Sequence, residues 1–573
     1  MMEYSDYAIV LKWQILNDEQ DIGNWEMLFE EDKSRVFGNG MNELIEALSQ
    51  LREDIINVIF VKNLNLFEVI GECYFSFALG YKAVIKDGNF SFFQLKILNN
   101  IELRNWDNWE EDVDDCDEFL RRLNLYRNNF KGRAVNKLNL KNHLNYTKAR
   151  DMFMDLVESY YLKSPWCKTF KEELLPKDED ELYLYTKVNK ASFYFMNPKY
   201  VNKVVENVIG YDISSSHSGF ILRKKYPLRG AKQCTSRKEI HKIIEDGFYA
   251  WIGEFEFIGL KEKIDLPIDL RSFGYINSDD NWVLRLTNAH WSAFKRLFTA
   301  ENMIPMKFRY FEQKELDRNY AKMINTIYLE KEHFKKNDDS FVKGIFKFRT
   351  ELPFGQSIKS PVAFQEVIYD EEENCFIKSK IEEQSFEDTV KKISKYAIPM
   401  HVGIWTAAYS WAEEVNMILD LGFENVVYGD TDCVKFVGEK GIKVIEAHNK
   451  EIDKETNSIS SKRNMLETSK KLGRWQYEGT FNRFKAIGVK WYLFDENGKI
   501  SVKAAGAIIP VLLAHLAKTE NPFEEFSKEM YVEGLFKNIC INRITHTVSV
   551  GYNNYMGDKL IRELKDKTNG FFI

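Results

Sequence analysis

The sequence has little proline and glycine, and its cysteines form no recognisable pattern. Its 573 residues include 11 Pro and 30 Gly, and no internal repeat or low-complexity tract is apparent, which argues against a linker-rich array. The seven cysteines contain no C-x-x-C pair. A zinc ribbon and a disulfide framework are therefore not expected, and a reducing cytoplasm is.

Long apolar runs and phosphate-binding loops are missing as well. No stretch of about 18 uninterrupted apolar residues occurs, and no basic segment followed by an apolar run opens the chain, so we expect neither a membrane span nor a signal peptide. No G-x-x-x-x-G-K-[ST] segment is present, which excludes a P-loop. Any triphosphate would have to be held by side chains and metal ions.

What the chain does have is many apolar and aromatic residues and a nearly even balance of charge. Hydrophobic residues make up 44% and aromatic residues 14%, enough for large cores, and the length predicts two to four domains. The net charge of −7 comes from 80 basic and 87 acidic residues, so the total does not indicate a nucleic-acid partner. Basic residues cluster over 223–242 and 462–490, where phosphate binding and a solvated surface are equally good interpretations.

The hydrophobic pattern divides the chain into three zones. Residues 1–170 have the pattern of a mixed α/β region, and from about 190 to 310 β-rich runs such as 209–222 alternate with basic loops. Beyond 311 the pattern predicts, in order, a helix over 315–334, a helix over 341–352 that begins at the caps 338–340 and stops at Gly355, a hairpin over 362–378, an apolar helix over 399–421, and a tail of helix and short strands from about 507.

Two aspartates lie at the centre of an apolar segment, VVYGDTDCVKF, over 426–436. Apolar residues on both sides favour an extended chain, and side chains two positions apart on a strand share a face. Asp430 and Asp432 are therefore expected to project together at the tip of a turn, where paired carboxylates suit a hard cation such as Mg²⁺. An ordinary aspartate-rich hairpin turn is an equally good interpretation of this segment by itself.

A third acidic position is Asp212, which ends the apolar run 208–211 in the segment GYDISSSHSGF. Its carboxylate is expected where a strand leaves its sheet. Three carboxylates from two remote strand ends could bind two metal ions, one to activate an attacking 3′-hydroxyl and both to stabilise the phosphate in transit and the leaving pyrophosphate. A lone acid at a strand end is more often a helix or turn cap.

A pair of lysines supplies candidate phosphate ligands. Lys343 and Lys347 are four positions apart in the helix predicted over 341–352. They would share a face of that helix and could grip a triphosphate as point charges. By themselves they are equally an ordinary solvated stripe.

Taken together, these segments resemble the motifs of the family B DNA polymerases. Y-G-D-T-D-C over 428–433 resembles motif C, Y-x-D-T-D-S, and residues 212–218 are similar to motif A, D-x-x-S-L-Y-P. K-F-R-T-E-L-P-F-G over 347–355 resembles motif B, K-x-x-x-N-S-x-Y-G, and K-W-Y over 490–492 matches the K-x-Y motif. Each motif alone is a weak signal, but four motifs in the family's order form a strong one.

The resemblance implies an α+β fold in the form of a right hand, preceded by a degenerate ribonuclease-H-like exonuclease domain. The implied divisions are the degenerate exonuclease-like domain at 1–188, palm with motif A at 189–224, an insertion at 225–322, fingers at 323–357, a hairpin insertion at 358–392, palm with motif C and K-x-Y at 393–506, and thumb at 507–573.

Among the family B polymerases, the closest subgroup is the protein-primed polymerases of phages, which places the chain in a bacterial cell or a phage-infected host. The interval from 212 to 347 has room for the insertion that grips a priming protein and DNA. The hairpin at 362–378 lies where a strand-displacement insertion would be, although a peripheral β-ribbon is an equal interpretation.

Roles at the metal and nucleotide sites follow from the resemblance. Asp212, Asp430 and Asp432 would be ligands of two Mg²⁺ ions, with Mn²⁺ as a substitute. Lys347, together with Lys343, would contact the triphosphate of the incoming dNTP. These five side chains would form the centre of the site.

Further roles concern the primer and the binding partners. Gly355 belongs to the same motif as Lys347 and is expected at the nucleotide site. Lys490 would support the primer end near the aspartates, and Tyr492 would pack the primer strand. The implied partners are primer-template DNA, dNTPs and a terminal or priming protein, with no membrane.

Two positions depart from the family pattern near the nucleotide. His217 stands where the family has a tyrosine that blocks the 2′-hydroxyl of a ribonucleotide. A smaller imidazole could relax this exclusion, and our hypothesis is weaker discrimination against ribonucleotides. Glu351 and Leu352 replace the Asn-Ser of motif B, and the residues alone give no account of what the acid favours.

The amino-terminal region departs most from the family. Phe67 stands where the second exonuclease motif has an aspartate, and Val10 and Lys12 lie near the positions of the first motif's acids. In the third motif the spacing leads to Arg150, with Asp151 one residue late. A two-metal nuclease cannot work with apolar and cationic groups in place of its carboxylates. We therefore predict a nuclease-like domain without 3′→5′ proofreading.

Two other functions remain open at this point. A specialised nucleotidyltransferase that adds nucleotides without a template, in a defence or mobile-element system, would fit the changed motif B. An inactive DNA-binding scaffold descended from a polymerase is the other. The three aspartates and the lysine motifs argue against the scaffold, because an inactive protein has no need of them.

Overall fold

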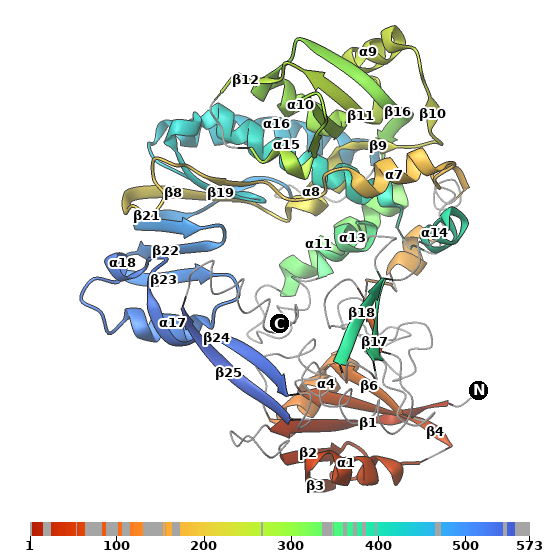
Figure 1. Ribbon diagram of the computed structural model, residues 1–573, viewed down its shortest axis with the longest axis vertical. Coiled ribbons are helices and arrows are strands. Elements are labelled where there is room, and N and C mark those ends of the chain that lie inside the picture. Colours follow the sequence, from red (N-terminus) through yellow and green to blue (C-terminus); the bar gives the residue numbers. More distant parts are fainter. Residues whose placement is uncertain are drawn as a thin grey trace.

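The computed structural model shows several sheets and helices, with the N-terminal strands at one end of the molecule and the long helix α15 (Met400–Leu421) toward the other (Figure 1). It describes residues 3–14, 24–62, 83–86, 101–105, 115–129, 153–162, 172–334, 347–358, 364–370, 375–380, 385–463, 472–542 and 547–555, without 53, 155, 265–267, 348, 395 and 397.

At the middle of the molecule lies a seven-stranded antiparallel sheet, here called the central sheet. Its strand order is β23-β22-β21-β8-β20-β19-β7, so strands from remote parts of the chain lie side by side. The strands are β7 (Tyr194–Met196), β8 (Val205–Ile213), β19 (Val426–Asp430), β20 (Cys433–Phe436), β21 (Trp475–Gly488), β22 (Trp491–Glu496) and β23 (Lys499–Ala504). Valine, isoleucine and aromatic residues dominate β8, β19 and β20, and these residue types favour pleated, buried strands.

One face of the central sheet is covered by the 22-residue helix α15 (Met400–Leu421). The helix begins directly after Pro399 and ends at Gly422, whose φ of 78° is a left-handed conformation that glycine adopts freely. Apolar side chains lie on most of its faces, because it is surrounded by the sheet and by the helices α7 (Glu179–Lys187), α8 (Ser216–Arg223), α10 (Asn288–Leu297), α13 (Leu352–Ser357) and α16 (Lys440–Arg463). No helix in the described ranges combines the length and the apolar character that crossing a membrane requires.

A second sheet, here called the insertion sheet, lies at the top of Figure 1. Its strand order is β10-β16-β11-β14-β13, with β9 also paired to β16. The elements of this region are β9 (Lys225–Pro227), β10 (Lys232–Gln233), α9 (Arg237–Asp246), β11 (Tyr249–Ile258), β12 (Lys261–Glu262), η2 (Leu270–Ser272), β13 (Gly274–Ile276), β14 (Trp282–Thr287), α10 (Asn288–Leu297), β15 (Phe298–Thr299) and β16 (Asn302–Glu315). Helix α10 packs on α15 and so joins this region to the central one.

The N-terminal sheet lies at the opposite end of the molecule, at the bottom of Figure 1. Its order is β3-β2-β1-β4-β6, with β1, β4 and β6 parallel to one another. The elements are β1 (Glu3–Gln14), β2 (Asn24–Phe29), β3 (Arg35–Asn39), α1 (Gly40–Ser49), β4 (Ile55–Lys62), β6 (Ile101–Asn105) and α4 (Cys116–Asn129). Apolar residues of β1, β2 and β4 pack with those of α4 in a separate small core.

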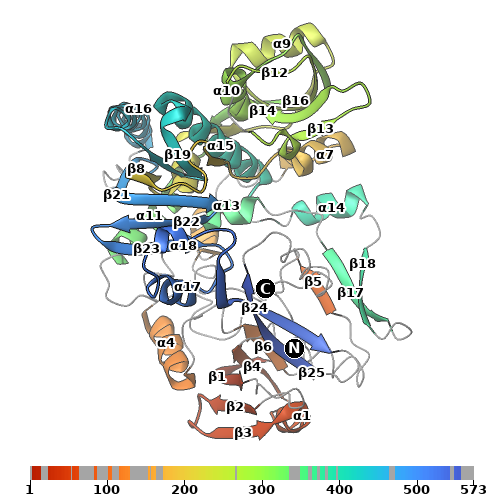
Figure 2. The same ribbon diagram turned by 60° about the vertical axis from the view of Figure 1, so that its left-hand side comes forward.

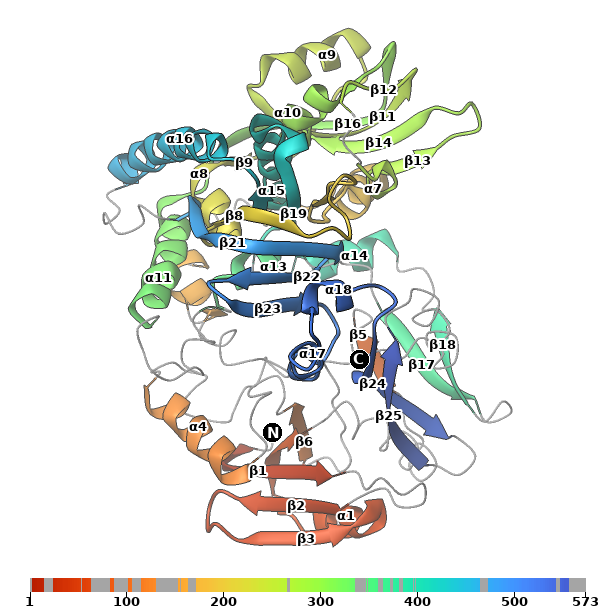
Figure 3. The same cartoon turned by 90° about the vertical axis from the view of Figure 1, so that its left-hand side faces the viewer.

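The remaining elements lie between the strands of these three regions in the chain or follow the central sheet. They are β5 (Ala83–Lys86), η1 (Val157–Tyr161), α7 (Glu179–Lys187), α8 (Ser216–Arg223), α11 (Arg318–Phe334), α13 (Leu352–Ser357), β17 (Phe364–Asp370), β18 (Cys375–Lys380), α14 (Phe386–Ile393), η3 (Phe423–Asn425), α16 (Lys440–Arg463), α17 (Ile509–Leu516), α18 (Pro522–Glu525), β24 (Tyr531–Asn542) and β25 (Thr547–Tyr555). The hairpin β17–β18 pairs with β5 to form a three-stranded sheet (Figure 2). Helix α17 packs under β23, at the edge of the central sheet (Figure 3).

Several sequence predictions of secondary structure are confirmed, and two are wrong. The helices predicted over 315–334 and 399–421 and the hairpin over 362–378 are present as α11, α15 and β17–β18. The β-rich run 209–222 is strand only as far as Ile213, after which α8 begins.

The stop predicted at Gly355 is the second error. Gly355 lies inside α13, which starts with Leu352 and Pro353. Proline is favoured in the first turn of a helix, where its missing N–H costs nothing. It therefore marks a new helix start at the point where an ending was predicted.

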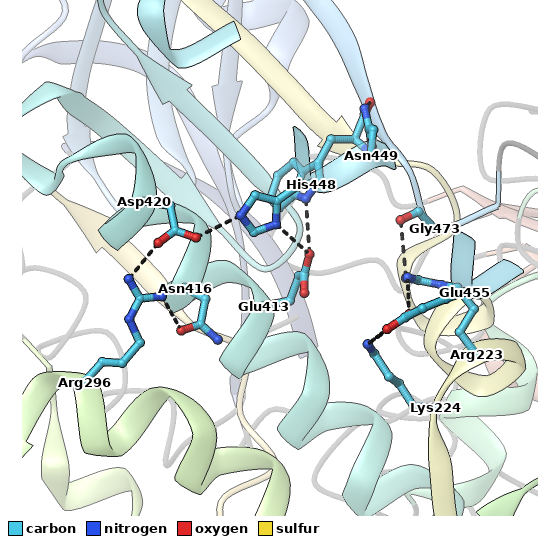
Figure 4. A network of polar contacts seen from close by, with 11 residues as sticks. Arg223, Lys224, Arg296, Glu413, Asn416, Asp420, His448, Asn449, Glu455 and Gly473 are labelled. Carbon is cyan, nitrogen blue, oxygen red and sulfur yellow. Dashed lines mark hydrogen bonds and ion pairs between the residues drawn. The ribbon is translucent and has the colours of Figure 1, made fainter. Parts of the chain in front are cut away.

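A network of polar contacts ties α10, α15 and α16 together (Figure 4). Arg296 of α10 donates to Asn416 at 2.8 Å and to Asp420 at 2.7 Å on α15. The other carboxylate oxygen of Asp420 lies 2.8 Å from His448 Nε2 on α16. This hydrogen bond raises the pKa of His448 above its ordinary value, against the effect of burial. The network holds the helices that cover the central sheet.

Candidate active site

The turn between β19 and β20 carries two of the predicted aspartates. Asp430 pairs with Cys433 across the two strands, so Thr431 and Asp432 form a two-residue turn. Thr431 has a φ of 62°, and its hydroxyl donates to Asp430 Oδ1 at 2.8 Å. The Asp432 N–H donates to the Asp430 carbonyl at 2.6 Å. Local hydrogen bonds thus hold both carboxylates in one tight turn.

Asp212 lies directly beside this turn on the neighbouring strand. In the β8–β20 register Asp212 is opposite Cys433, and the N–H of Ile213 donates to the Asp432 carbonyl at 2.7 Å. The antiparallel order of the central sheet therefore brings the three aspartates together from remote parts of the chain. We call these three residues the carboxylate cluster.

The carboxylate cluster concentrates negative charge where water is scarce. Burial and nearby acids, with Asp212 foremost, raise the pKa of Asp432 to about 8. Burial and the charge of Glu478 raise the pKa of Asp212 to about 6. Carboxylates that repel one another in this way are the groups that a divalent cation stabilises, and oxygen ligands suit Mg²⁺. In the part of the chain that the structure describes, no group of three or more acidic, histidine or cysteine side chains has the arrangement that holds a metal ion, and this includes the three aspartates as they lie here.

An ion pair that the sequence analysis missed borders Asp212. Lys435 of β20 pairs with Glu478 of β21, and the lysine side chain is only 3% exposed. Its ammonium lies 5.6 Å from the centroid of the Phe481 ring. Alternation along β20 could have placed Lys435 on the face of Asp212 and Cys433. No local signal could have placed Glu478, because the register of β21 against β8 shifts near that residue.

A second missed residue is Glu414, which lies behind the turn on α15. Its side chain is fully buried, and neither carboxylate oxygen has a hydrogen-bond partner among the described residues. A Cβ at Gly429 would come within 2.9 Å of Glu414 Oε1, so only glycine fits beside it. Burial and the charges of Asp430 and Asp432 raise the pKa of Glu414 well above its ordinary value. The surroundings of Glu414 at the back of the site therefore favour its protonated form.

Lys490 and Tyr492 reach the cluster through Tyr428. The backbone N–H of Lys490 donates to the Tyr428 hydroxyl at 2.9 Å, and that hydroxyl donates to Asp430 Oδ2 at 3.2 Å. The rings of Tyr492 and Tyr428 have centroids 5.1 Å apart, and the Lys490 ammonium lies 5.6 Å from the centroid of the Tyr194 ring. The segment predicted to meet the primer is thus hydrogen-bonded to a candidate metal ligand.

The predicted triphosphate ligands are placed in part. Lys347 is exposed, and its charge lowers the pKa of Asp212, whereas Lys343 lies outside the described residues. Lys331 of α11 is a cation that the sequence analysis missed. Its ammonium donates to Ser215 Oγ at 2.7 Å and also acts on Asp212. Gly355 is exposed on α13, with open space around the position of a Cβ.

The two departures near the nucleotide motifs meet in space. His217 Nδ1 lies 3.1 Å from Glu351 Oε2, and the imidazole stacks on the Phe354 ring with centroids 3.9 Å apart. Burial acts against ionisation of Glu351, but the hydrogen bond and charge of His217 and the charge of Lys331 lower its pKa. Glu351 is therefore a carboxylate on the rim of the carboxylate cluster.

The basic stretch over 223–242 is in part committed to acidic partners. Arg223 is 3% exposed, and both it and Lys224 pair with Glu455 of α16. Arg229 and Lys232 pair with Glu312 at 3.8 and 3.6 Å. Arg223 therefore has a structural role, whereas the Arg229 and Lys232 side chains stay 63% and 51% exposed.

The N-terminal sheet has an apolar and a cationic residue near the positions expected for nuclease acids. Val10 is buried in β1, and Lys12 is partly buried two positions later. In the parallel register Lys12 is the neighbour of Lys62 on β4. Phe67 and the segment 146–151 lie outside the described residues.

The fold matches solved structures of one polymerase along nearly its whole length. An orthorhombic crystal form of phi29 DNA polymerase has a TM-score of 0.66 at 13% identity, over 96% of this chain and 100% of that chain. The fold resembles that of phi29 DNA polymerase. The complex of phi29 DNA polymerase with primer-template DNA and incoming nucleotide substrates has a TM-score of 0.64 at 13% identity, with the same coverage. No protein-family model matches the sequence, and no curated protein matches it.

The likeness to phi29 DNA polymerase concerns the fold. It confirms the expected mixed helix-and-sheet architecture of polymerase type. At 13% identity, individual side chains have to be judged by their own geometry, because a fold can be kept while its sites change.

Proposed function

We propose that this protein is a DNA polymerase that adds dNTPs to a primer end by two-metal nucleotidyl transfer. The observation that carries the proposal is the meeting of Asp212, Asp430 and Asp432 on neighbouring strands in a fold that resembles phi29 DNA polymerase. Phi29 DNA polymerase binds primer-template DNA and incoming nucleotides, and the same partners are proposed here. The central sheet would be the palm, α11 and α13 part of the fingers, and the region from α17 the thumb.

The carboxylate cluster would hold two Mg²⁺ ions. When bound, the ions supply activation of the primer 3′-hydroxyl and neutralisation of charge on the triphosphate. The chain's own contribution is to fix the carboxylates. Asp430 is held by the hydroxyls of Thr431 and Tyr428, and Asp212 is held by the strand register.

Cations around the cluster would bind the triphosphate and the primer. Lys347 and Lys331 both act electrostatically on Asp212, and they approach from the helical side of the site. Lys490 approaches through Tyr428 from β22 and its preceding turn. A nucleotide between these groups would have its phosphates near the cluster and its primer partner near Lys490.

Proofreading would be absent. The N-terminal sheet carries Val10 and Lys12 near the positions expected for nuclease acids, and Lys62 lies beside Lys12. Cations and apolar groups cannot replace carboxylates as ligands of catalytic metal ions.

Priming by a protein and strand displacement are the further parts of the proposal. The insertion sheet follows motif A in the chain and would offer the surface for a priming protein. The hairpin β17–β18 pairs with β5 of the N-terminal region, which would let it separate two strands beside the copied template.

Primer extension on a defined template tests the proposal. We expect template-directed addition of dNTPs in the presence of Mg²⁺ or Mn²⁺, and its loss in Asp430→Ala. Homopolymer substrates serve as the control for untemplated addition. Undiminished synthesis by Asp430→Ala would contradict the proposed site.

The same assay separates the alternative functions. Addition without regard to the template would support the specialised nucleotidyltransferase, for which the His217–Glu351 pair at the nucleotide side of the site is the favouring observation. Binding of DNA without synthesis would support the inactive scaffold.

A further inference from the structure

His217 and Glu351 form one unit, although 134 positions separate them in the chain. His217 belongs to α8, and Glu351 is the residue directly before α13. A second bond links the same two helices one residue further on, where the Ser218 hydroxyl donates to the Thr350 carbonyl at 3.0 Å. Their pairing is therefore part of the packing of α8 against α13.

In this pair His217 is held by packing, whereas Glu351 is exposed to solvent. The imidazole lies nearly parallel to the Phe354 ring, at an interplanar angle of 7°, so it cannot swing without losing that stack. The His217 side chain is 14% exposed, whereas the Glu351 side chain is 52% exposed. The histidine thus anchors a carboxylate that is half exposed to solvent.

The open carboxylate has capacity for a further hydrogen bond. Oε2 is taken by His217 at 3.1 Å, and among the described residues Oε1 receives only the Thr350 hydroxyl at 3.5 Å. An ionised carboxylate can accept about four hydrogen bonds. Oε1 can therefore accept a donor from a bound molecule.

The position of the carboxylate indicates which part of a nucleotide it meets. His217 lies five positions after Asp212, where the chain passes from β8 into α8, and the Lys331 ammonium donates to Ser215 Oγ between them at 2.7 Å. In a nucleoside triphosphate only the O5′ and C5′ atoms separate the α-phosphate from the sugar ring. If the phosphates lie at the carboxylate cluster, the sugar must lie within reach of the groups on its rim.

We propose that Glu351 is a specificity-determining residue that accepts a hydrogen bond from the 2′-hydroxyl of a ribonucleoside triphosphate, with His217 as its positioning residue. This inference rests on the proposed function and adds a substrate class to it. Carboxylates bind ribose hydroxyls in the same way in dinucleotide-binding folds. The His217–Glu351 pair would thus favour ribonucleotides through a hydrogen bond. A small residue at position 217 would by itself only leave room for the 2′-hydroxyl.

The test is incorporation of a single nucleotide on a primed template, with kcat and KM measured separately for a dNTP and the rNTP of the same base. In Glu351→Met, kcat/KM for the rNTP should fall by about 10- to 100-fold, mainly through KM, because a hydrogen bond to a charged group is lost. The value for the dNTP should stay within about threefold. Glu351→Gln should lose less, because its amide oxygen still accepts a hydrogen bond.

Three further arms isolate the mechanism. His217→Leu removes the bond to Glu351 without placing a larger ring near the sugar, so it should lower rNTP use without abolishing it. A 2′-fluoro nucleotide cannot donate a hydrogen bond and should be used no better than the dNTP by the unaltered protein. Glu439→Gln removes an exposed carboxylate far from the unit in the chain and should leave the sugar preference unchanged.

The outcomes separate this inference from the proposed function. Equal losses for both sugars in Glu351→Met would mean that the unit only clamps α8 to α13, and a loss for neither would mean that it does not meet the sugar. Either result, with template-directed dNTP addition intact, overturns the inference and leaves the polymerase. Absence of all synthesis by the unaltered protein overturns both.

Discussion

The central sheet and the N-terminal sheet differ in the charge of the side chains that their strand registers bring together. In the central sheet the register puts Asp212 opposite the turn that holds Asp430 and Asp432. In the N-terminal sheet the register puts Lys12 beside Lys62. Both sheets have well-packed apolar strands.

The difference shows that packing and chemistry are carried by different positions. Buried residues such as Val10 and Phe60 keep the N-terminal strands together. Their packing does not restrict which residue type occupies the polar position at the end of a strand. A sheet can therefore lose its acids and stay folded. The likeness to phi29 DNA polymerase extends over 96% of this chain and makes no distinction between the two sheets.

The largest contrast is expected from one neutralising substitution in each sheet. Asp430→Asn should lower template-directed synthesis by about 10³-fold or more. The substitution removes a ligand of a metal ion that would stabilise the negative charge of the transition state by several kcal/mol. Lys12→Met should leave synthesis within about twofold, because the N-terminal sheet contributes no group to the transfer. The measurement is the rate of primer extension at saturating dNTP.

Either variant can contradict the expected difference between the two sheets. A strong loss in Lys12→Met at unchanged thermal stability would give the N-terminal sheet a direct part in synthesis. Retained activity in Asp430→Asn would remove the carboxylate cluster from the mechanism.

A second contrast concerns nuclease activity. The purified protein should not shorten a 3′-labelled single strand in Mg²⁺ or Mn²⁺, under conditions where it extends a primer. The control is the same strand with a nuclease added, which shows that it can be digested. Digestion that Asp151→Ala abolishes would place a working nuclease in the N-terminal region.

The sequence predicted well those features that depend on neighbouring residues. The apolar helix over 399–421 and the strand pair around Asp430 and Asp432 are visible as local patterns, and both are present. The start of α13 also has a local signal, Pro353 at its second position, although Gly355 two residues later is typical of a helix end.

What could not be predicted arises from contacts between remote segments. Glu414 has the pattern of an ordinary polar position in a helix, and only the packing of α15 against β19 buries it. The partnership of His217 with Glu351 depends on how α8 meets α13. Lys331 approaches Asp212 only because α11 crosses near the strand end. Contacts of this kind between remote segments leave no periodic pattern in the sequence.

Buried glutamates give a contrast of intermediate size. Glu414→Met should stabilise the protein by about 1–3 kcal/mol, because it removes a buried acid that lacks a partner among the described residues. Glu30→Met should destabilise by a similar amount, because Glu30 Oε2 accepts the buried N–H of Ala8 at 2.7 Å.

The two glutamate variants differ in their pH dependence as well. The folded-state pKa of Glu414 is raised, so its protonated form is the one that folding favours, and stability falls as pH rises above the ordinary value of 4.5. The gain in Glu414→Met should therefore be larger at alkaline pH. The measurement is thermal unfolding at several pH values. A loss of stability in Glu414→Met would mean that this carboxyl has a partner that the described residues do not supply.

The smallest expected difference is between the stabilisation by an ion pair whose histidine titrates near neutral pH and that by an ion pair whose arginine stays charged. His448 pairs with Asp420 beside the central sheet at 2.8 Å, and Arg35 pairs with Glu26 and Asp117 in the N-terminal region. The raised pKa of His448 means that its stabilisation is fully present below the ordinary value of 6.5 and is lost as pH rises through the folded-state pKa. The effect of His448→Gln should therefore be about 1 kcal/mol or less at about pH 5.5 and vanish near pH 8.5, whereas Arg35→Gln should have the same effect at both. Unfolding temperatures of the two variants at both pH values test this, and a His448→Gln effect that does not change with pH would show that His448 contributes by packing, without its charge.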